Sequence, residues 1–385
     1  MSSISDSERI TFIMRTVEKY GVSFNCGGTA HIQGLIDAAV QDGTRTATVT
    51  GNWDVESHIS IPSDFTLILD GCYLKMADNT FDNMFVNLHH GTDIGKTVAG
   101  TDKNIRILGK NGAIIDGGTY NGLSEQNSRK DGMPPVYMNN LIFFTNVDGI
   151  EMANFALHNF RWWAVNFIYC SNGYIHDITL KGDDTCTDKD GNEYHGLSLE
   201  NYFDMHIRQA DGIDIRKGCH HFLIENIYGF TGDDTVALTC LPGKMEAEFA
   251  VEALAPDLSH VMVRHVHSAS LDAGVRILCQ GGTTLHDVIV DDVVDISDKI
   301  PGILGRALQT VRIGDSDKMY GSRHSEGREV YNVTVKNIRS RAKYALYIAG
   351  NPIENFVCEN VVAFDGGEIV DNRWEGYEFT AGRKE

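Results

Sequence analysis

The sequence is poor in proline and in positive charge, and it has no long apolar run. Its 385 residues contain 7 prolines against 39 glycines, a balance typical of many turns between short strands. Lys and Arg number 33 against 53 Asp and Glu, so the formal net charge is −20. Such an acidic surface repels nucleic acid and anionic lipid, and no stretch of 18 apolar residues occurs. We therefore expect neither a nucleic-acid nor a membrane partner.

The chain also lacks the cysteine pairs of a disulfide scaffold or a zinc site. Its eight cysteines are scattered without a CxxC pair, which favours free thiols in a reducing compartment. Residues 1–20 have no basic region followed by an apolar one, so they do not read as a signal peptide. We expect a cytoplasmic protein that needs no cofactor and no metal.

A short pattern recurs along most of the chain: an apolar residue, a variable one, a polar Asn, Asp or His, and a second apolar residue. The spacing is 23 to 27 residues, apart from two longer gaps. The polar members are Asn154, Asp177, Asn201, Asn226, His265, Asp292, Asn337 and Asn360. A period in this range with alternating apolar positions predicts a solenoid in which each repeat is one coil of short strands. The expected fold is all-β: a single-domain right-handed parallel β-helix.

The two longer gaps and the N-terminal segment depart from the repeat. The gaps predict insertions at about 241–258 and 300–328, which on a solenoid form loops, often on the binding face. Residues 28–41 have apolar side chains at helical spacing, and we interpret them as a helix that caps the open end. The expected organisation is one domain over 1–385: a cap region over 1–57, coils over 58–370 and a tail over 371–385.

Several aspartates should meet on one patch of this solenoid. The segments 211–215, 234–238 and 273–277 superpose when their apolar residues are aligned, so that Asp214 and Arg276 point outward. Asp211 and Asp234 then begin neighbouring strands, with Asp233 and Asp272 close by, and neighbouring coils stack about 4.8 Å apart. Carboxylates this close raise at least one pKa, which provides the acid and base of glycosidic hydrolysis. Two other interpretations of these aspartates remain: a set of acidic turns without function, or a calcium site made from the same oxygens.

The same residues resemble a known family. Residues 209–211 read QAD, and the GDD of residues 232–234 places two aspartates 22 and 23 residues after Asp211. Residues 65–71 (FTLILDG), 112–118 (GAIIDGG) and 160–163 (FRWW) add matches over most of the chain. Together these motifs resemble glycoside hydrolase family 28, the polygalacturonase family. The resemblance implies that Asp233 is the general acid, that Asp211 and Asp234 hold and activate water, and that the anomeric configuration is inverted.

Two departures from the family pattern bear on the substrate. Leu271-Asp272-Ala273 stands where the family has Gly-His-Gly, and Arg312-Ile313-Gly314 stands where it has Arg-Ile-Lys. The family's arginine and lysine grip a uronate carboxylate, and here only Arg312 remains, with Arg276 as the candidate to replace the lysine. Further candidate substrate contacts are Trp163, whose outward ring could stack on a sugar, and His195. Asp214 and Asp272 complete the predicted binding set.

We therefore expect an exo-acting glycoside hydrolase on oligosaccharides of a pectin-like or related glycan. An intracellular enzyme meets imported fragments, and the two insertions could close one end of the cleft. A polysaccharide lyase on the same scaffold is the first alternative and would need a basic proton abstractor and often calcium. A glycan-binding β-helix without catalysis is the second. Self-association into a homo-oligomer stays open.

Overall fold

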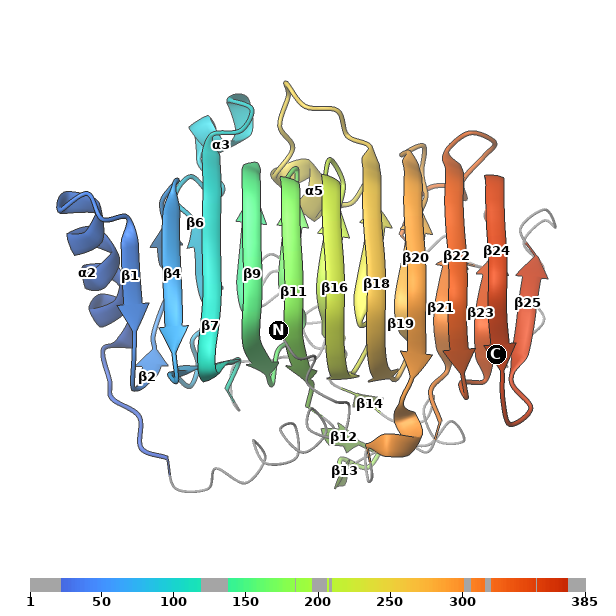
Figure 1. The fold of residues 1–385 in the computed structure, drawn as a ribbon, viewed down its shortest axis with the longest axis horizontal. Coiled ribbons are helices and arrows are strands. Elements are labelled where there is room, and N and C mark those ends of the chain that lie inside the picture. Colours follow the sequence, from blue (N-terminus) through green and yellow to red (C-terminus); the bar gives the residue numbers. More distant parts are fainter. Residues whose placement is uncertain are drawn as a thin grey trace.

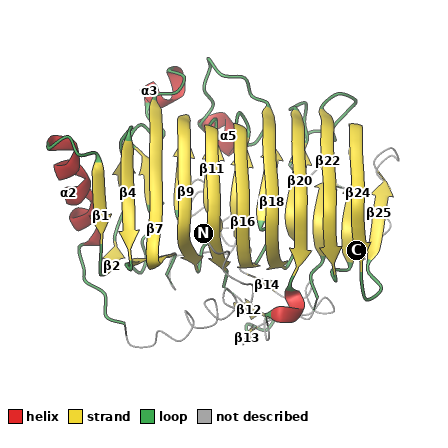
Figure 2. Cartoon of the chain, viewed as in Figure 1, coloured by secondary structure: helices red, strands yellow, loops and turns green. Residues whose placement is uncertain are grey.

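The computed structural model describes residues 22–118, 138–183, 185–195, 206–207, 210–300, 306–315, 320–350 and 352–372. Within them the chain forms a right-handed parallel β-helix, with the strands stacked side by side along the long axis of the molecule (Figure 1). Two parallel sheets, one of long strands and one of short strands, make the walls (Figure 2). In the part of the chain that is described, no helix is long and apolar enough to cross a membrane.

The long sheet has twelve strands, and all of its pairings are parallel. Its main path, in spatial order, is β1 (Thr46–Val49), β4 (Phe65–Asp70), β7 (Asp102–Asp116), β9 (Val147–His158), β11 (Ser171–Lys181), β16 (His220–Thr231), β18 (Leu258–Ser270), β20 (Leu285–Asp295), β22 (Val330–Ser340) and β24 (Glu354–Ala363), with β2 (Asn52–Val55) and β5 (Tyr73–Met76) paired beside it. Parallel pairing therefore begins at β1, inside the segment that the sequence analysis assigned to the cap.

The short sheet has ten strands and carries the predicted site. Its order is β3 (Ile59–Ile61), β6 (Phe85–Asn87), β8 (Ile142–Thr145), β10 (Trp162–Ile168), β15 (Ala210–Arg216), β17 (Val236–Cys240), β19 (Ala273–Cys279), β21 (Gln309–Gly314), β23 (Tyr344–Ala349) and β25 (Glu368–Asn372). A separate antiparallel sheet is formed by β12 (Thr185–Thr187), β13 (Glu193–His195) and β14 (His206–Ile207). The remaining elements are the helices α2 (Gly28–Gln41), α3 (Asp93–Thr97) and α5 (Lys244–Glu248), and the 3₁₀ helix η2 (Ser297–Lys299).

The repeated polar residue has a structural cause. Every described member of the series has a positive φ, which places it in the left-handed region where Asn and Asp are tolerated best. In Asn337, for example, φ is 57°, and its side-chain amide donates to Asp291 Oδ1 at 2.7 Å on the neighbouring coil. The long strands bend at these residues, so the repeat marks one corner of each coil. Asn201 lies outside the described residues.

The core lies inside the coils, where apolar side chains of equivalent positions stack on one another. One such stack runs through Ile175, Ile224, Val263, Val290 and Val335, all of which are fully buried. The helix α2 covers the first coil with Ile32, Ile36 and Ala39, as the apolar spacing of residues 28–41 predicted (Figure 1). Five of the seven described cysteines are buried, and all seven are free thiols.

Of the two predicted insertions, one is confirmed and one needs correction. Residues between β17 and β18 leave the coil and contain α5, as expected for 241–258. Residues 300–328 are not one insertion, because β21 lies within them and pairs with β19 and β23 in the regular ladder. The long spacing arises because more residues separate β21 from β20 and from β22 than separate the corresponding strands of the neighbouring coils.

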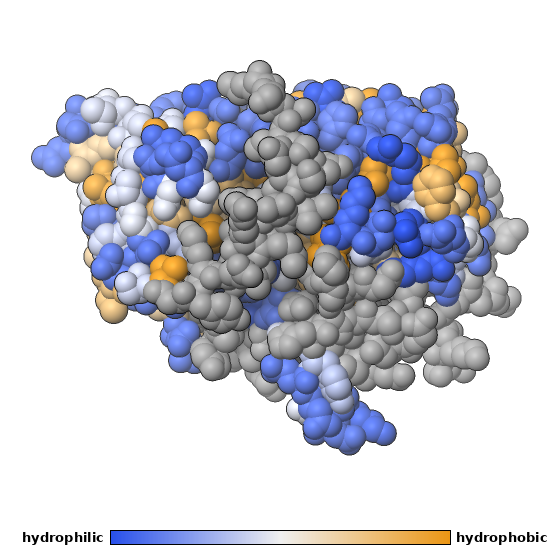
Figure 3. Space-filling model, turned by 60° about the horizontal axis from the view of Figure 1, so that its bottom comes forward, coloured by the Kyte–Doolittle hydropathy of each residue, from blue (hydrophilic) through white to orange (hydrophobic). Residues whose placement is uncertain are grey.

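One face of the described part of the molecule is mostly hydrophilic. In Figure 3, which brings the bottom of Figure 1 forward, hydrophilic residues cover most of the described surface and hydrophobic residues occupy small separate areas.

Candidate active site

Three consecutive strands of the short sheet, β15, β17 and β19, align as the sequence predicted. Ile213 pairs with Val236, which pairs with Val275, so the segments 211–215, 234–238 and 273–277 superpose. One position further along, a single row crosses the sheet from strand to strand. Its members are Asn166, Asp214, Ala237, Arg276, Arg312 and Tyr347.

The three predicted catalytic aspartates meet at one end of these strands. Asp211 lies at the start of β15, and Asp233 and Asp234 lie in the turn between β16 and β17. One carboxylate oxygen from each lies within 4.8 Å of the other two. This confirms the proximity that strand stacking predicted for Asp211, Asp233 and Asp234.

Backbone hydrogen bonds between coils hold this arrangement. The N–H of Gly212 donates to the Asp234 carbonyl at 2.8 Å, and the N–H of Asp233 donates to the Ala210 carbonyl at 3.1 Å. The hydroxyls of Thr231 and Ser270 both donate to the Asp233 carbonyl, at 2.8 and 2.6 Å. The turn is thereby held on both sides, which limits the movement of the carboxylates that it carries.

Burial and mutual repulsion favour a proton within the set. Burial, followed by the negative charge of Asp272, raises the pKa of Asp234 to about 8. Burial, together with the charges of Asp214, Asp233 and Asp234, raises the pKa of Asp211 well above its usual range. Interacting carboxyl groups titrate together, so the proton belongs to the set rather than to one residue. At neutral pH the set can therefore offer both a carboxylic acid and a carboxylate.

Trp163 and Asp214 are held by partners that the sequence did not reveal. The Trp163 ring donates from Nε1 to Asp211 Oδ2 at 2.9 Å, and the Arg216 guanidinium lies 4.0 Å above the ring centroid. Arg216 also donates to Asp214 at 2.8 Å and to Glu246 of α5 at 3.1 Å. Asp214 is 0% exposed, so its carboxylate has protein partners instead of the open outer face that strand alternation predicted.

The two predicted cations are also paired within the protein. Arg312 Nη1 donates to both carboxylate oxygens of Asp272, at 3.2 and 2.9 Å, and its Nη2 lies 3.0 Å from Asp315 Oδ1. Arg276, which is only 4% exposed, donates to Asp315 Oδ2 at 2.9 Å. Arg276 therefore lies beside Arg312, as predicted, but the carboxylates of Asp272 and Asp315 neutralise the two guanidinium groups.

The sequence analysis did not identify three neighbours of the candidate site, for different reasons. Arg216 follows Asp214 by two positions, and Asp315 follows Arg312 by three, so local spacing could have pointed to both. Glu246 comes from the insertion, and nothing in its sequence indicates that it returns to the site. The side chain of His195 lies outside the described part of the structure, so its predicted contact stays a prediction.

The three aspartates could also hold a hard cation, because carboxylate oxygens are the ligands that calcium prefers. Calcium takes about six to eight oxygens. The three residues supply only part of such a set, and each oxygen of Asp211 already accepts one hydrogen bond, from Trp163 or from the Asp234 N–H. This arrangement is better suited to acid–base chemistry than to a dedicated calcium site.

Solved structures share this fold at low sequence identity. An endo-xylogalacturonan hydrolase from Aspergillus tubingensis is 13% identical, with a TM-score of 0.53, over 88% of this chain and 82% of that chain. A tailspike protein of Escherichia coli bacteriophage HK620, in complex with a pentasaccharide, is 13% identical with a TM-score of 0.52. That match covers 88% of this chain and 53% of the tailspike chain. No curated protein matches the sequence significantly.

The family assignment comes from the sequence itself. The model of "Glycosyl hydrolases family 28" matches residues 54–250, just over half of the chain. The matched range runs from the first coils through all three clustered aspartates. It also includes Trp163 and Arg216, which contact Asp211 and Asp214. The chain therefore belongs to glycosyl hydrolases family 28.

Proposed function

We propose that this protein hydrolyses glycosidic bonds in oligosaccharides of a pectin-like or related glycan, with Asp233 as general acid and Asp211 and Asp234 holding the water. The single observation that carries the proposal is the convergence of the three carboxylates within 4.8 Å in a partly buried environment that favours a retained proton. Glycosidic hydrolysis requires such a set, because the leaving oxygen must be protonated while water is deprotonated. The division of roles among the three follows the family resemblance.

The sugar bound beside Arg312 is proposed to be neutral rather than a uronate. A uronate carboxylate is gripped by a cation that is free to bind it. Here Arg312 is engaged by Asp272 and Asp315, and Arg276 is engaged by Asp315. An incoming carboxylate would have to displace a buried ion pair and would meet the charge of Asp272. These pairs support a pectin-like glycan that presents a neutral sugar at this position.

We propose that contacts between α3 and the segment that contains α5 close one end of the outer face, which would favour exo action. Met245 and Phe249, from the segment that contains α5, pack against Phe143 on β8. Lys96 of α3 donates to Glu248 of α5 at 2.7 Å, and both helices lie toward the upper ends of the strands in Figure 1. We propose that the substrate enters with a chain end directed at this closure.

The stereochemical course is proposed to be inversion, as the family resemblance implies. The carboxyl groups of inverting enzymes are typically about 6.5–9.5 Å apart, and those of retaining enzymes about 5–5.5 Å. One oxygen of each carboxylate lies within 4.8 Å of the other two, and we place the attacking water between Asp211 and Asp234, as the family resemblance implies. Proton NMR of the first product formed distinguishes the two courses, because only inversion gives the opposite anomer.

The decisive experiment is Asp233→Asn, assayed on an oligosaccharide panel by released reducing sugar. We expect a loss of turnover of about 10²–10⁴-fold, the usual contribution of an acid–base group, with little change in melting temperature. Asp298→Asn is the matched control, because Asp298 forms a surface ion pair with Arg341 at 3.3 Å. Turnover above half of the wild-type value in Asp233→Asn would refute the assignment. Binding without turnover by the wild-type protein would favour a non-catalytic glycan-binding β-helix.

A further inference from the structure

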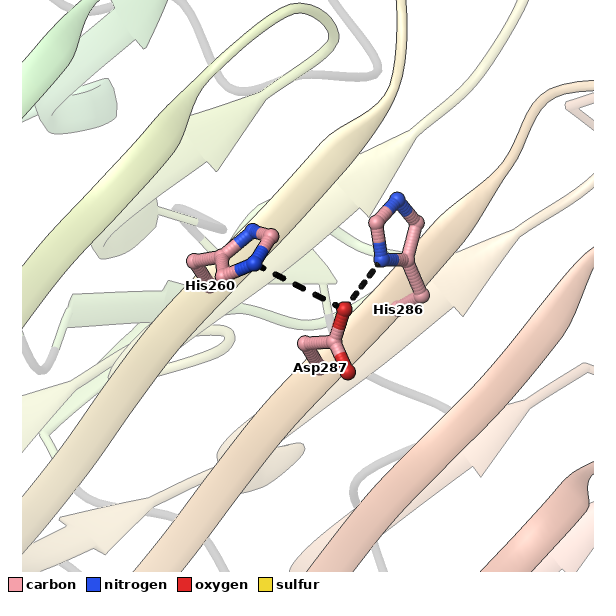
Figure 4. Close-up of side chains that lie close together, drawn as sticks. All are labelled: His260, His286 and Asp287. Carbon is pink, nitrogen blue, oxygen red and sulfur yellow. Dashed lines mark hydrogen bonds and ion pairs between the residues drawn. The ribbon is translucent and has the colours of Figure 1, made fainter.

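A second cluster of polar side chains lies on the long sheet, away from the aspartates. It consists of His260 on β18 and His286 and Asp287 on the adjacent strand β20, and we call it the histidine cluster (Figure 4). The two strands pair in parallel, with Ser259 opposite His286, so His260 and Asp287 occupy equivalent corners of successive coils. Both have φ of 55°, the left-handed conformation of the repeat. The coil geometry therefore fixes the two backbones relative to each other.

The three side chains point toward one another. His286 Nδ1 lies 2.7 Å from Asp287 Oδ2, and His260 Nε2 lies 3.8 Å from the same oxygen (Figure 4). One ligand atom from each residue lies within 4.8 Å of the other two. Zinc bonds to nitrogen and oxygen of about 2.0–2.1 Å place neighbouring ligand atoms roughly 3.3 Å apart in a tetrahedron. An ion would therefore need shifts of less than about 1 Å in the two distances to Asp287 Oδ2.

Neighbouring residues hold each of the three in this orientation. His260 Nδ1 lies 3.0 Å from the Ser259 hydroxyl, which leaves Nε2 for the cluster. Asp287 Oδ1 accepts from Asn332 at 2.8 Å, which leaves Oδ2 directed at both imidazoles. The ring of His286 stacks on a tyrosine of the next coil, Tyr331, with centroids 4.6 Å apart. Outer partners of this kind orient metal ligands and are typical of metal sites.

From this geometry we propose that His260 Nε2, His286 Nδ1 and Asp287 Oδ2 form a binding site for a zinc-class divalent ion. Two imidazoles and one carboxylate suit zinc, copper or nickel, whereas magnesium and calcium prefer oxygen ligands alone. The side chain of His260 is 50% exposed, so the ion can enter from solvent and water can complete the coordination. A bound ion would link β18 to β20 and so stabilise the stacking of two coils.

The same two strands offer an internal comparison. Five positions further along, His265 Nδ1 and His267 Nε2 lie 2.7 and 3.4 Å from Asp292 Oδ2. These three residues do not bring three ligand atoms within 4.8 Å of one another. Arg339 also donates to Asp292 Oδ1 at 3.2 Å, which places a positive charge beside any ion bound there. His265 is therefore a matched control with the same residue type, strand and left-handed conformation as His260.

The test is zinc binding to the full chain without a histidine tag, by isothermal titration calorimetry and by the shift in melting temperature. The variants are His260→Asn and His265→Asn, because Asn tolerates the left-handed conformation at both positions. We expect zinc to bind and to raise the melting temperature of the wild type. His260→Asn should weaken the strongest binding at least tenfold, and His265→Asn should leave it unchanged. Magnesium should cause no shift.

Three further measurements serve as controls for the zinc titration. Circular dichroism of the metal-free variants checks that each is folded, and Asp287→Asn provides a second, nearly isosteric loss of a ligand. Asp233→Asn should bind zinc as the wild type does, which separates this site from the clustered aspartates. Absence of zinc binding by the wild type, or unchanged binding by both His260→Asn and Asp287→Asn, would overturn the proposal. Equal weakening in His265→Asn would also overturn it, by showing nonspecific binding to surface histidines.

Discussion

The backbone N–H of Asp234 donates a hydrogen bond to Asp211 Oδ1 at 3.1 Å, across two neighbouring coils. This bond joins the start of β15 to the turn before β17 and fixes the spacing of two catalytic candidates. Trp163 donates to the other oxygen of the same carboxylate at 2.9 Å. The Asp211 side chain is thus held by both adjacent coils, and a water bound there would meet a pre-ordered acceptor.

Stability should depend on pH through Asp234. Burial raises its pKa to about 8, so the folded protein keeps a proton that the unfolded chain releases above about pH 4. This contribution is complete below about pH 4 and is lost as the pH rises toward 8. We expect the melting temperature of Asp234→Asn to fall less between pH 5 and about 8 than that of the wild type. Parallel curves for the two proteins would contradict the buried, proton-retaining aspartate; Asp298→Asn should follow the wild type.

Removal of Arg216 should destabilise the protein far more than removal of a surface arginine. Arg216 pairs with Asp214 and Glu246, both almost fully buried, so Arg216→Met leaves two carboxyl groups without their cation. The expected cost is about 3–5 kcal/mol in the free energy of unfolding. In the control Arg106→Met, the lost pair is the exposed Arg106–Glu151, and the expected cost is below about 1 kcal/mol. Urea unfolding of both variants measures the difference, and similar losses would argue against a buried network.

Asp272→Asn should shift substrate preference toward uronates. The substitution removes the carboxylate that accepts two hydrogen bonds from Arg312 and so frees part of that guanidinium. A charge-assisted hydrogen bond is worth about 1.5–3 kcal/mol, so we expect the ratio of kcat/KM for a uronate over a neutral substrate to rise about tenfold or more. The comparison needs paired oligosaccharides that differ only in this sugar. A wild-type preference for the uronate would defeat the proposed neutral subsite.

Turnover should not require a divalent metal. The proposed mechanism uses the carboxyl groups of Asp211, Asp233 and Asp234 as acid and base, and no step passes through an ion. Dialysis against a chelator should leave kcat unchanged, even though it would strip zinc from the histidine cluster. If activity disappeared and calcium restored it, with an unsaturated product detected by its absorbance, the chain would act as a polysaccharide lyase.

The products should be short and uniform from the start of the reaction. A closed end of the binding face accepts a chain terminus but does not let a polymer pass through. We therefore expect steady release of one small product from a polymer and from its oligomers, followed by chromatography over time. Early mixtures of intermediate lengths, with a rapid fall in viscosity, would demonstrate internal cleavage.

The sequence by itself determined the solenoid and the register of its central strands. Apolar residues alternate along each segment, and a slip of one residue would turn every inward side chain to the outside. That constraint allowed Ile213, Val236 and Val275 to be aligned from their letters alone, and the alignment placed Asp211 beside Asp234. The capping helix over residues 28–41 was also predictable, because apolar residues at helical spacing place one apolar face against the coil.

Only the tertiary structure decided what each outward residue contacts. Glu246 reaches Arg216 from a loop whose path is set by packing against Phe143, and no local pattern encodes that return. The split of the expected 300–328 insertion around β21 depended on pairing with β19 and β23, which are distant in sequence. The histidine cluster likewise exists because two coils stack in register. Periodicity specifies which way a side chain faces, whereas its partners depend on how loops and neighbouring coils fold back over it.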